Sequence, residues 1–324
     1  MKIILISENQ ILKFITFNQG NSIGLGKAPH KPILLLAVIK AIENNVISEN
    51  KIYITPELVS YFKSYWDQLV FTGHTSNFSL PFFHLKNEKS KLWTLKNKPG
   101  YEFALTSSNS IRSFKALNDA TDYAHLDDGF YQLLKEKKYR DFVRSLIMHK
   151  YFPNEELSDD GKGDYLRKIE NEIVSDSSTD YVLRVKKLIK QDDAEEEIYL
   201  RGAAFKKQIP RIYDYTCAIT GMKVVAISDI SLIDACHIIP FKESFDDTIH
   251  NGISLCPNMH RAFDRGIISI DANYRVLVSD KFIENHSSHS IRQFEGKEIK
   301  LPQTSKLYPS QSNLENHRRR FNFN

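Results

Sequence analysis

Three short segments decide the fold of this chain: CAITG (residues 217–221), DACHIIPF (234–241) and NGISLCPNMHRAFDRG (251–266). The residues around His237 favour a strand, Asn251-Gly252 is typical of a tight turn, and Pro257 suits the first turn of a helix that contains His260. Two imidazoles and an amide, carried on a strand, a loop and a helix, are suited to phosphodiester hydrolysis with one metal ion. One histidine can activate water, the asparagine can hold it in place, and the second histidine can bind a divalent cation.

The same segments predict a metal site for one Mg²⁺ or Mn²⁺ ion. His260 and Asp264 are four positions apart on the predicted helix and therefore share a face. Asp234 is the predicted third ligand, although an ideal strand places it on the face opposite to His237 unless a bulge re-aims it. Cys236 directly precedes His237, but its soft thiol is poorly matched to Mg²⁺.

These motifs resemble the HNH nuclease family, whose ββα-metal fold carries its functional residues in this order. The resemblance implies that His237 is the general base, that Asn251 orients it, and that His260 binds the metal ion. It rests on the ITG, HIIP, LCPN and DRG segments around these three residues. The alternatives are that the residues are structural, or that the site is a catalytically inactive copy.

The cysteines depart from a pattern that many HNH proteins show. Many members carry two CxxC pairs that bind a structural zinc, but the corresponding positions here read Cys217-Ala-Ile-Thr220 and Cys256-Pro-Asn-Met259. Because half of the thiolates are missing, a structural Cys₄ zinc is not expected. Cys217 and Cys256 are predicted to be small buried residues.

Two amino-terminal segments resemble the sulfur-binding domain of McrA-like type IV restriction endonucleases. They read GLGKAPHKP, followed by ILLLAVI, at residues 24–39, and NFSLPFFHL at residues 77–85. That domain recognises DNA in which sulfur replaces one non-bridging phosphate oxygen. The residues that this resemblance implies for DNA and sulfur binding are His30, Lys31, Leu80, Pro81 and His84.

Sulfur recognition by such residues is physically reasonable. A phosphorothioate remains anionic, but its sulfur is larger and more weakly hydrated than oxygen, so an apolar cup favours it. A proline ring and aliphatic carbons can form the cup, while a cation holds the remaining oxygens. The alternatives are that LPFF begins a buried strand and that PHKP only initiates a helix.

The bulk composition agrees with a DNA-binding globular protein without requiring one. The 324 residues are 41% hydrophobic and 26% charged, with a formal net charge of +4. The fold class predicted is α+β, with a DNA-reading domain at residues 1–153, a helical connector at 154–197 and the nuclease domain at 198–324. Because no run of about 18 apolar residues occurs, no membrane association is expected and the cytoplasm is the predicted location.

The sequence as a whole predicts a modification-dependent endonuclease that binds phosphorothioate-modified double-stranded DNA. One alternative is an HNH endonuclease that reads methylated or unmodified DNA. The other is a non-catalytic DNA-binding regulator on an HNH scaffold. A homodimer is predicted, because one HNH site cuts one strand. The basic run from His317 to Arg320 is a further candidate for contact with the DNA backbone.

Overall fold

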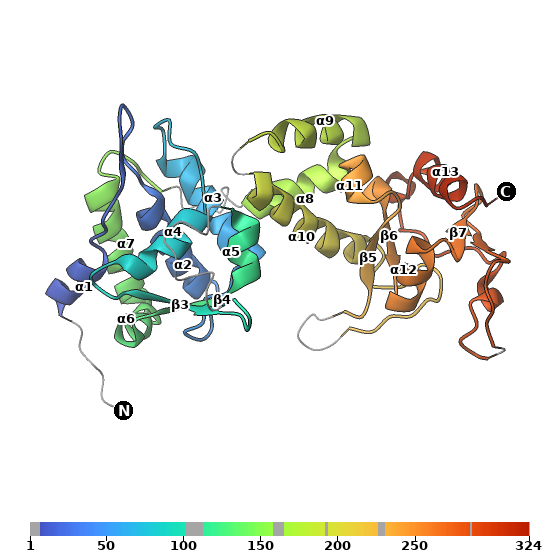
Figure 1. The fold of residues 1–324 in the computed structure, drawn as a ribbon, viewed down its shortest axis with the longest axis horizontal. Coiled ribbons are helices and arrows are strands. Elements are labelled where there is room, and N and C mark those ends of the chain that lie inside the picture. Colours follow the sequence, from blue (N-terminus) through green and yellow to red (C-terminus); the bar gives the residue numbers. More distant parts are fainter. Residues whose placement is uncertain are drawn as a thin grey trace. The chain divides into compact units, whose positions relative to one another are not determined.

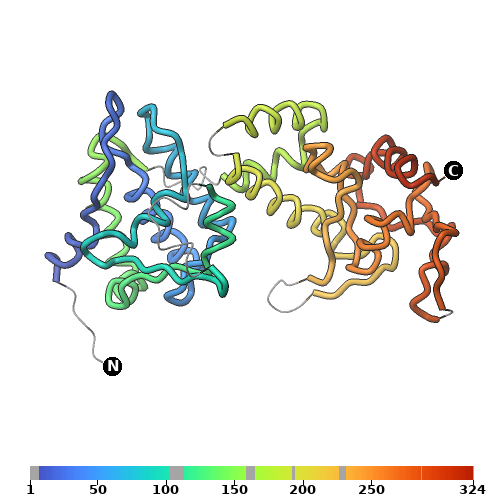
Figure 2. The backbone as a smooth tube through the Cα atoms, in the orientation of Figure 1, coloured from blue at the N-terminus to red at the C-terminus, as the bar shows by residue number. Residues whose placement is uncertain are grey.

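The computed structural model describes residues 7–101, 113–157, 165–191, 194–225, 231–285 and 287–323. Figures 1 and 2 show the course of the chain, which forms two compact units. The first unit comprises Met1–Arg167 and Gln191–Leu200, and the second comprises Lys168–Lys190 and Arg201–Asn324. Each unit is described by itself below.

The first unit combines helices with small antiparallel sheets. Its helices are α1 (Glu8–Phe14), α2 (His30–Glu43), α3 (Pro56–Leu69), α4 (Ser79–His84), η1 (Leu85–Asn87), α5 (Phe114–Ala120), α6 (Asp128–Leu134) and α7 (Lys137–Tyr151). Its strands pair as β1 (Asn21–Ser22) with β2 (Gly26–Lys27), and as β3 (Trp93–Asn97) with β4 (Thr121–Leu126).

Helix α2 forms the centre of the first unit. Every side chain from Ile33 to Ile39 is fully buried. A helix that is apolar all round must be covered on all sides, and α3, α4 and α7 pack against it. Its first turn, with His30 and Lys31, is therefore anchored on the most buried element of the unit and lies beside α4.

The second unit includes the remaining elements, although α8 and α10 each begin in the first unit. Its helices are α8 (Tyr165–Ser175), α9 (Ser178–Leu188), α10 (Ala194–Ile212), α11 (Phe241–Ser244), η2 (Ile249–Asn251), α12 (Pro257–Asp264), η3 (Arg292–Phe294), η4 (Ser305–Leu307) and α13 (Gln311–Arg320). Its strands are β5 (Asp234–His237), β6 (Gly252–Leu255), β7 (Ile268–Ile270) and β8 (Val276–Val278).

A ββα arrangement forms the centre of the second unit. Strands β5 and β6 pair antiparallel, with His237 opposite Gly252. Helix α12 follows β6 and packs against both strands, as Figure 1 shows. Pro257 occupies its first turn, and Gly266 lies just beyond its end with φ +64°, a left-handed conformation that favours glycine.

Close approach of α10 explains the glycine at the start of β6. A Cβ atom at Gly252 would overlap the side chain of Ile209 and would lie 3.0 Å from Cε2 of Phe205. Any larger residue would therefore require the side chains of Ile209 and Phe205 on α10 to shift. The glycine of the Asn-Gly pair serves helix packing here.

The architecture confirms the α+β class. The LPFF segment lies on helix α4, so the alternative of a buried strand is wrong. Residues 154–197, predicted as a connector, are divided between the two compact units. Among the described residues, no helix has both the length and the apolar character needed to cross a membrane.

Candidate active site

The ring of His237 is held by two neighbours at the end of β5. Its Nε2 lies 2.8 Å from Oδ1 of Asp247, whose side chain is only 3% exposed. The ring stacks on Phe205 of α10, with centroids 3.8 Å apart and planes inclined by 7°. These contacts fix the plane and the rotation of the imidazole, while 26% of the His237 side chain stays exposed to solvent.

The pairing with Asp247 determines which nitrogen of His237 can accept a proton. A carboxylate only accepts hydrogen bonds, so the Nε2 atom of neutral His237 carries the hydrogen and donates it to Asp247. Nδ1 then has the free lone pair. Sequence analysis did not single out Asp247, which follows α11 in the loop toward η2.

Asn251 acts on the loop that follows His237. Its side chain is fully buried. Its Oδ1 accepts a hydrogen bond from the backbone N–H of Ile239 at 2.9 Å, and its Nδ2 donates to the carbonyls of Ile239 at 2.8 Å and Asp246 at 2.9 Å. Asn251 thereby ties the end of β5 to the residue that precedes Asp247. Its link to His237 in this structure runs through the backbone.

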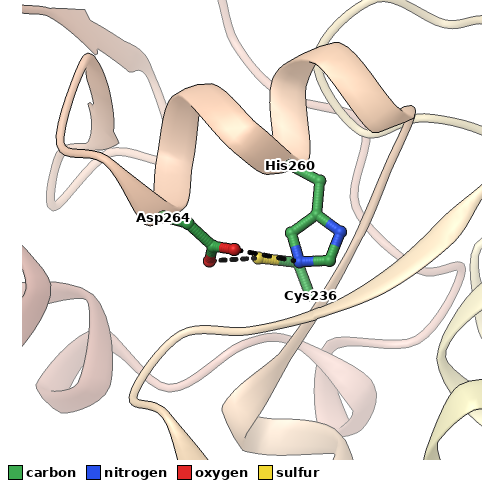
Figure 3. Close-up of side chains that lie close together, drawn as sticks. All are labelled: Cys236, His260 and Asp264. Carbon is green, nitrogen blue, oxygen red and sulfur yellow. Dashed lines mark hydrogen bonds and ion pairs between the residues drawn. The ribbon is translucent and has the colours of Figure 1, made fainter.

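A cluster of potential metal ligands lies between β5 and α12. Cys236, His260 and Asp264 each offer one ligand atom, and these atoms all lie within 4.8 Å of one another. Figure 3 shows the three side chains converging between the helix and the strand. Oδ2 of Asp264 lies 3.5 Å from Nε2 of His260, and its Oδ1 lies 3.8 Å from Sγ of Cys236.

Asp234 contacts the opposite side of the His260 ring. Its Oδ2 lies 3.2 Å from Nδ1 of His260, whereas Asp264 approaches Nε2. The Nε2 edge of the His260 ring therefore lies near Cys236 and Asp264, whereas Asp234 lies at the Nδ1 edge. Strand alternation carries both Asp234 and Cys236 toward α12, because they are two positions apart.

The thiol of Cys236 is protonated in this arrangement. Its side chain is fully buried. Burial raises the pKa of the Cys236 thiol well above its ordinary value, and the nearby carboxylate of Asp264 raises this pKa further.

One cavity joins the two parts of the site. It has a volume of about 340 Å³ and is lined by His237, His260 and Asp264, together with Lys242 and Arg320. An imidazole and two potential metal ligands therefore line the same space, and Lys242 and Arg320 add positive charge to it.

The basic run on α13 is only partly available for such contact. His317 is 3% exposed, and its ring stacks on Phe263 at 3.7 Å. At 3% exposure, His317 offers little surface for the predicted DNA contact, although it lines part of the cavity. Arg320 lines the cavity and pairs with Glu243 at 2.9 Å.

One buried histidine, His317, and one half-buried histidine, His30, make the stability of the protein pH-dependent. Burial lowers the pKa of His317 to about 4, and burial also lowers the pKa of His30 to about 4. In an unfolded chain both have a pKa of about 6.5. As the pH falls from 6.5 toward 4, these histidines become protonated in the unfolded chain while they stay neutral in the folded chain. We therefore expect the free energy of unfolding to fall by up to roughly 3 kcal/mol per group.

Urea denaturation at pH 7.5 and pH 5 measures this effect. The variant His317→Gln removes one of the two titrations, so its loss of stability between the two pH values should be smaller than that of the wild type. Equal stability of the wild type at both pH values would contradict the assignment of neutral buried histidines.

The residues predicted to read sulfur gather at the contact of α2 and α4. His30 and Lys31 lie in the first turn of α2, and Leu80, Pro81 and His84 lie on α4. Pro81 is buried, whereas Leu80 is 37% exposed. The accessible apolar surface at this point is therefore that of Leu80.

The polar groups of this region already have partners within the first unit. Nε2 of His30 lies 3.0 Å from the carbonyl of Thr75. Lys31 donates to the carbonyl of Asn18 at 2.8 Å and forms an ion pair with the buried carboxylate of Glu88. Burial lowers the pKa of His84, and the nearby cation of Lys31 lowers this pKa further. Sequence analysis did not single out Glu88, which offsets the charge of Lys31.

The amino-acid sequence matches the HNH endonuclease family model over residues 217–271. This match covers β5, β6 and α12, and with them His237, Asn251, His260 and Asp264. No match was found among curated proteins.

Three solved structures are similar to parts of the chain. The modification dependent TagI restriction endonuclease is 20% identical over 36% of this chain and 37% of that one, with a TM-score of 0.27. The sulfur binding domain of ScoMcrA complexed with phosphorothioated DNA is 19% identical over 49% of this chain and 96% of that one, with a TM-score of 0.35. The type IV phosphorothioation-dependent restriction endonuclease ScoMcrA is 11% identical over 79% of this chain and 94% of that one, with a TM-score of 0.33.

Proposed function

We propose, on the premise that residues 217–271 form an HNH endonuclease domain, that the protein is a modification-dependent DNA endonuclease of the type IV restriction class. The first unit binds phosphorothioate-modified double-stranded DNA, and the second hydrolyses phosphodiester bonds in the cytoplasm. The observation that carries the proposal is the shared cavity, which places His237 beside the His260–Asp264 pair.

In this mechanism His237 is the general base. Its Nδ1 takes a proton from the attacking water, and Asp247 stabilises the resulting imidazolium through the hydrogen bond from Nε2–H. Phe205 and Asn251 keep the ring and the following loop in position. The cation of Arg320 attracts the phosphate backbone toward the cavity.

His260 and Asp264 are the proposed ligands of one divalent cation, Mg²⁺ or Mn²⁺. Their imidazole nitrogen and carboxylate oxygen are suitable donors, and their ligand atoms lie within 4.8 Å of each other. Asp234 orients His260 through the other ring nitrogen, an interaction that supports metal-ligating histidines in general. The bound ion supplies positive charge beside the scissile phosphate, where negative charge develops during hydrolysis.

The proposed reading surface combines apolar side chains, two imidazoles and one cation on α2 and α4. Leu80, with the buried Pro81 packed beside it, provides the apolar contact for sulfur, while His30, Lys31 and His84 contact the oxygens of the same phosphate. A weakly hydrated sulfur loses less solvation than oxygen on entering such a surface. Because Lys31 also forms an ion pair with Glu88, only part of its positive charge acts on a DNA phosphate.

Two duplexes of identical sequence, with and without one phosphorothioate, test the proposal. Binding and cleavage are measured for both at the same salt concentration, because affinity for DNA depends strongly on salt. Sulfur-dependent binding and cleavage are expected. Equal cleavage of both duplexes would favour an HNH endonuclease that reads methylated or unmodified DNA. Binding without cleavage, whichever divalent ion is added, would favour the regulator.

Leu80→Asp is expected to abolish discrimination between sulfur and oxygen. The substitution places a negative charge at the exposed apolar residue of the reading surface, where it repels the phosphate and disfavours the sulfur. Leu80 is a better position for this substitution than Pro81, because Pro81 is buried and an aspartate at position 81 would also destabilise the fold. The ratio of the two dissociation constants measures the effect. A folded Leu80→Asp protein with an unchanged ratio would remove Leu80 from the reading surface.

A homodimer is proposed for double-strand cleavage. Each site has one water-activating base and cuts one strand at a time, so two protomers are needed to break both strands together, and twofold dimers are the commonest soluble oligomers. Light scattering with and without DNA should detect the dimer. A protein that is monomeric in both states and still breaks both strands in one event would contradict it.

A further inference from the structure

The geometry around Cys236 suggests which class of metal ion the nuclease site prefers. Cys236 lies on β5 beside the two proposed ligands, and it is fully buried. Its Sγ lies 3.8 Å from Oδ1 of Asp264, and the ligand atoms of Cys236, His260 and Asp264 lie within 4.8 Å of one another. A sulfur, a nitrogen and an oxygen therefore converge on one point (Figure 3).

Asp234 contacts the imidazole of His260 on the edge that faces away from this cluster. Its carboxylate lies 3.2 Å from Nδ1 of His260, so it accepts the Nδ1 hydrogen and leaves the Nε2 lone pair on the side of Cys236 and Asp264. A carboxylate on the second nitrogen is the usual support of a metal-ligating histidine, and it also increases the basicity of the ligand.

We propose that Cys236, His260 and Asp264 form a three-ligand site for a thiophilic divalent ion of the Zn²⁺ or Co²⁺ class, which they bind in preference to Mg²⁺. This inference rests on the proposed nuclease function and refines its metal site: Mg²⁺ or Mn²⁺ can occupy the site, but a third ligand, Cys236, shifts the preference toward a thiophilic ion. Three protein ligands with a free fourth position are typical of catalytic zinc sites. Two of the three residues that would hold the ion, His260 and Asp264, line the same cavity as His237.

The donor set explains the preference. Mg²⁺ requires oxygen ligands in near-ideal octahedral geometry, and a thiolate is a poor ligand for it. Zn²⁺ and Co²⁺ accept mixed sulfur, nitrogen and oxygen ligands, and they bind more tightly than Mn²⁺ in the general affinity order of divalent metals. Coordination deprotonates a thiol outright, so the proton of Cys236 is displaced when such an ion binds.

Cobalt titration of the full chain tests the proposal without depending on activity. Co²⁺ bound to a thiolate gives a sulfur-to-cobalt charge-transfer absorption in the near ultraviolet, which oxygen and nitrogen ligands do not give. We expect this band in the wild-type protein at one Co²⁺ per chain. Cys236→Ser should abolish the band, and Asp234→Asn should weaken Co²⁺ binding by about 10–100-fold.

The other cysteines provide the matched control. Cys217 and Cys256 are also buried, and Thr220 contacts both of their sulfurs, at 3.4 Å and 3.9 Å. Cys256→Ser should keep the band, because these thiols lie outside the proposed cluster. A band that survives in Cys236→Ser and disappears in Cys256→Ser would overturn the assignment. Absence of the band in folded wild-type protein would overturn it as well.

A further variant tests the selectivity for one metal ion over another, and cleavage assays separate the metal-site proposal from the nuclease proposal. Cys236→Asp replaces the sulfur by oxygen, so the Mg²⁺ concentration needed to displace Co²⁺ should fall. If that concentration is the same as for the wild type, the thiophilic preference is wrong. Cleavage supported by Mg²⁺ without any cobalt band would refute this inference and keep the nuclease. A cobalt band in a protein that cuts no DNA would refute the nuclease and keep the metal site.

Discussion

Replacing His237 by alanine is expected to slow DNA cleavage by at least about 10²–10⁴-fold, the range that general-base catalysis contributes. The variant loses the group that takes the proton from water, whereas the reading residues on α2 and α4 are unchanged. Binding of modified DNA should therefore remain at the wild-type level. Single-turnover cleavage at saturating DNA, combined with a binding titration, measures the two effects separately.

His250→Ala is the matched control for this experiment. His250 lies in the same region of the chain, but its Nδ1 lies 3.0 Å from the carbonyl of Tyr308, and it is not among the residues that line the cavity. This variant should cut DNA nearly as fast as the wild type. Comparable cleavage by correctly folded His237→Ala would remove His237 from the role of base.

Asp247→Asn is expected to reduce kcat by roughly 10²–10⁴-fold, by the mechanism known from the aspartate of serine proteases. The amide of asparagine can donate to Nε2 of His237, which moves the hydrogen to Nδ1 and removes the lone pair that accepts the proton. The effect should fall on kcat, with KM unchanged, because Asp247 is buried and acts only through His237. Steady-state cleavage of one modified duplex measures both constants.

The neighbouring aspartate offers a stringent control. Asp246 is also buried, but its carboxylate accepts a hydrogen bond from the backbone N–H of Thr248 at 2.8 Å. An asparagine at position 246 can accept the same bond, so Asp246→Asn should retain most of the activity. Equal losses in Asp246→Asn and Asp247→Asn would indicate a general effect on the loop and would contradict a specific role of Asp247.

Local sequence patterns predicted the framework of the site. A strand around His237 and a helix that begins at Pro257 follow from short-range preferences of the residues concerned. These preferences depend on neighbours within one turn or one strand, so they are visible in the chain itself. The grouping of His260 with Asp264 follows from helical periodicity in the same way.

Partners across loops could not be predicted in this way. Asp247 meets His237 only because Asn251 closes the loop between them, and no spacing rule describes that loop. Glu88 meets Lys31 from a different element of the first unit. Both carboxylates are defined by tertiary packing, which a single sequence does not reveal.

Sequence analysis discounted Cys236 as a ligand because its soft thiol is poorly matched to Mg²⁺. Asp234 and Cys236 are two positions apart and therefore share a face of β5. The strand pattern alone does not tell which of them reaches which nitrogen of the ring. Which residue contacts which ring nitrogen depends on how deeply each side chain is buried beneath helix α12, and the sequence does not show this.

Gly252 links the packing of α10 to the position of the His237 ring. A side chain at position 252 would meet Ile209 and Phe205 of α10, and Phe205 stacks on His237. An alanine there would displace the helix slightly, and a modest loss of packing is felt most at high temperature. Gly252→Ala is thus a natural starting point for a temperature-sensitive variant, which keeps its fold when cool and loses it when warm.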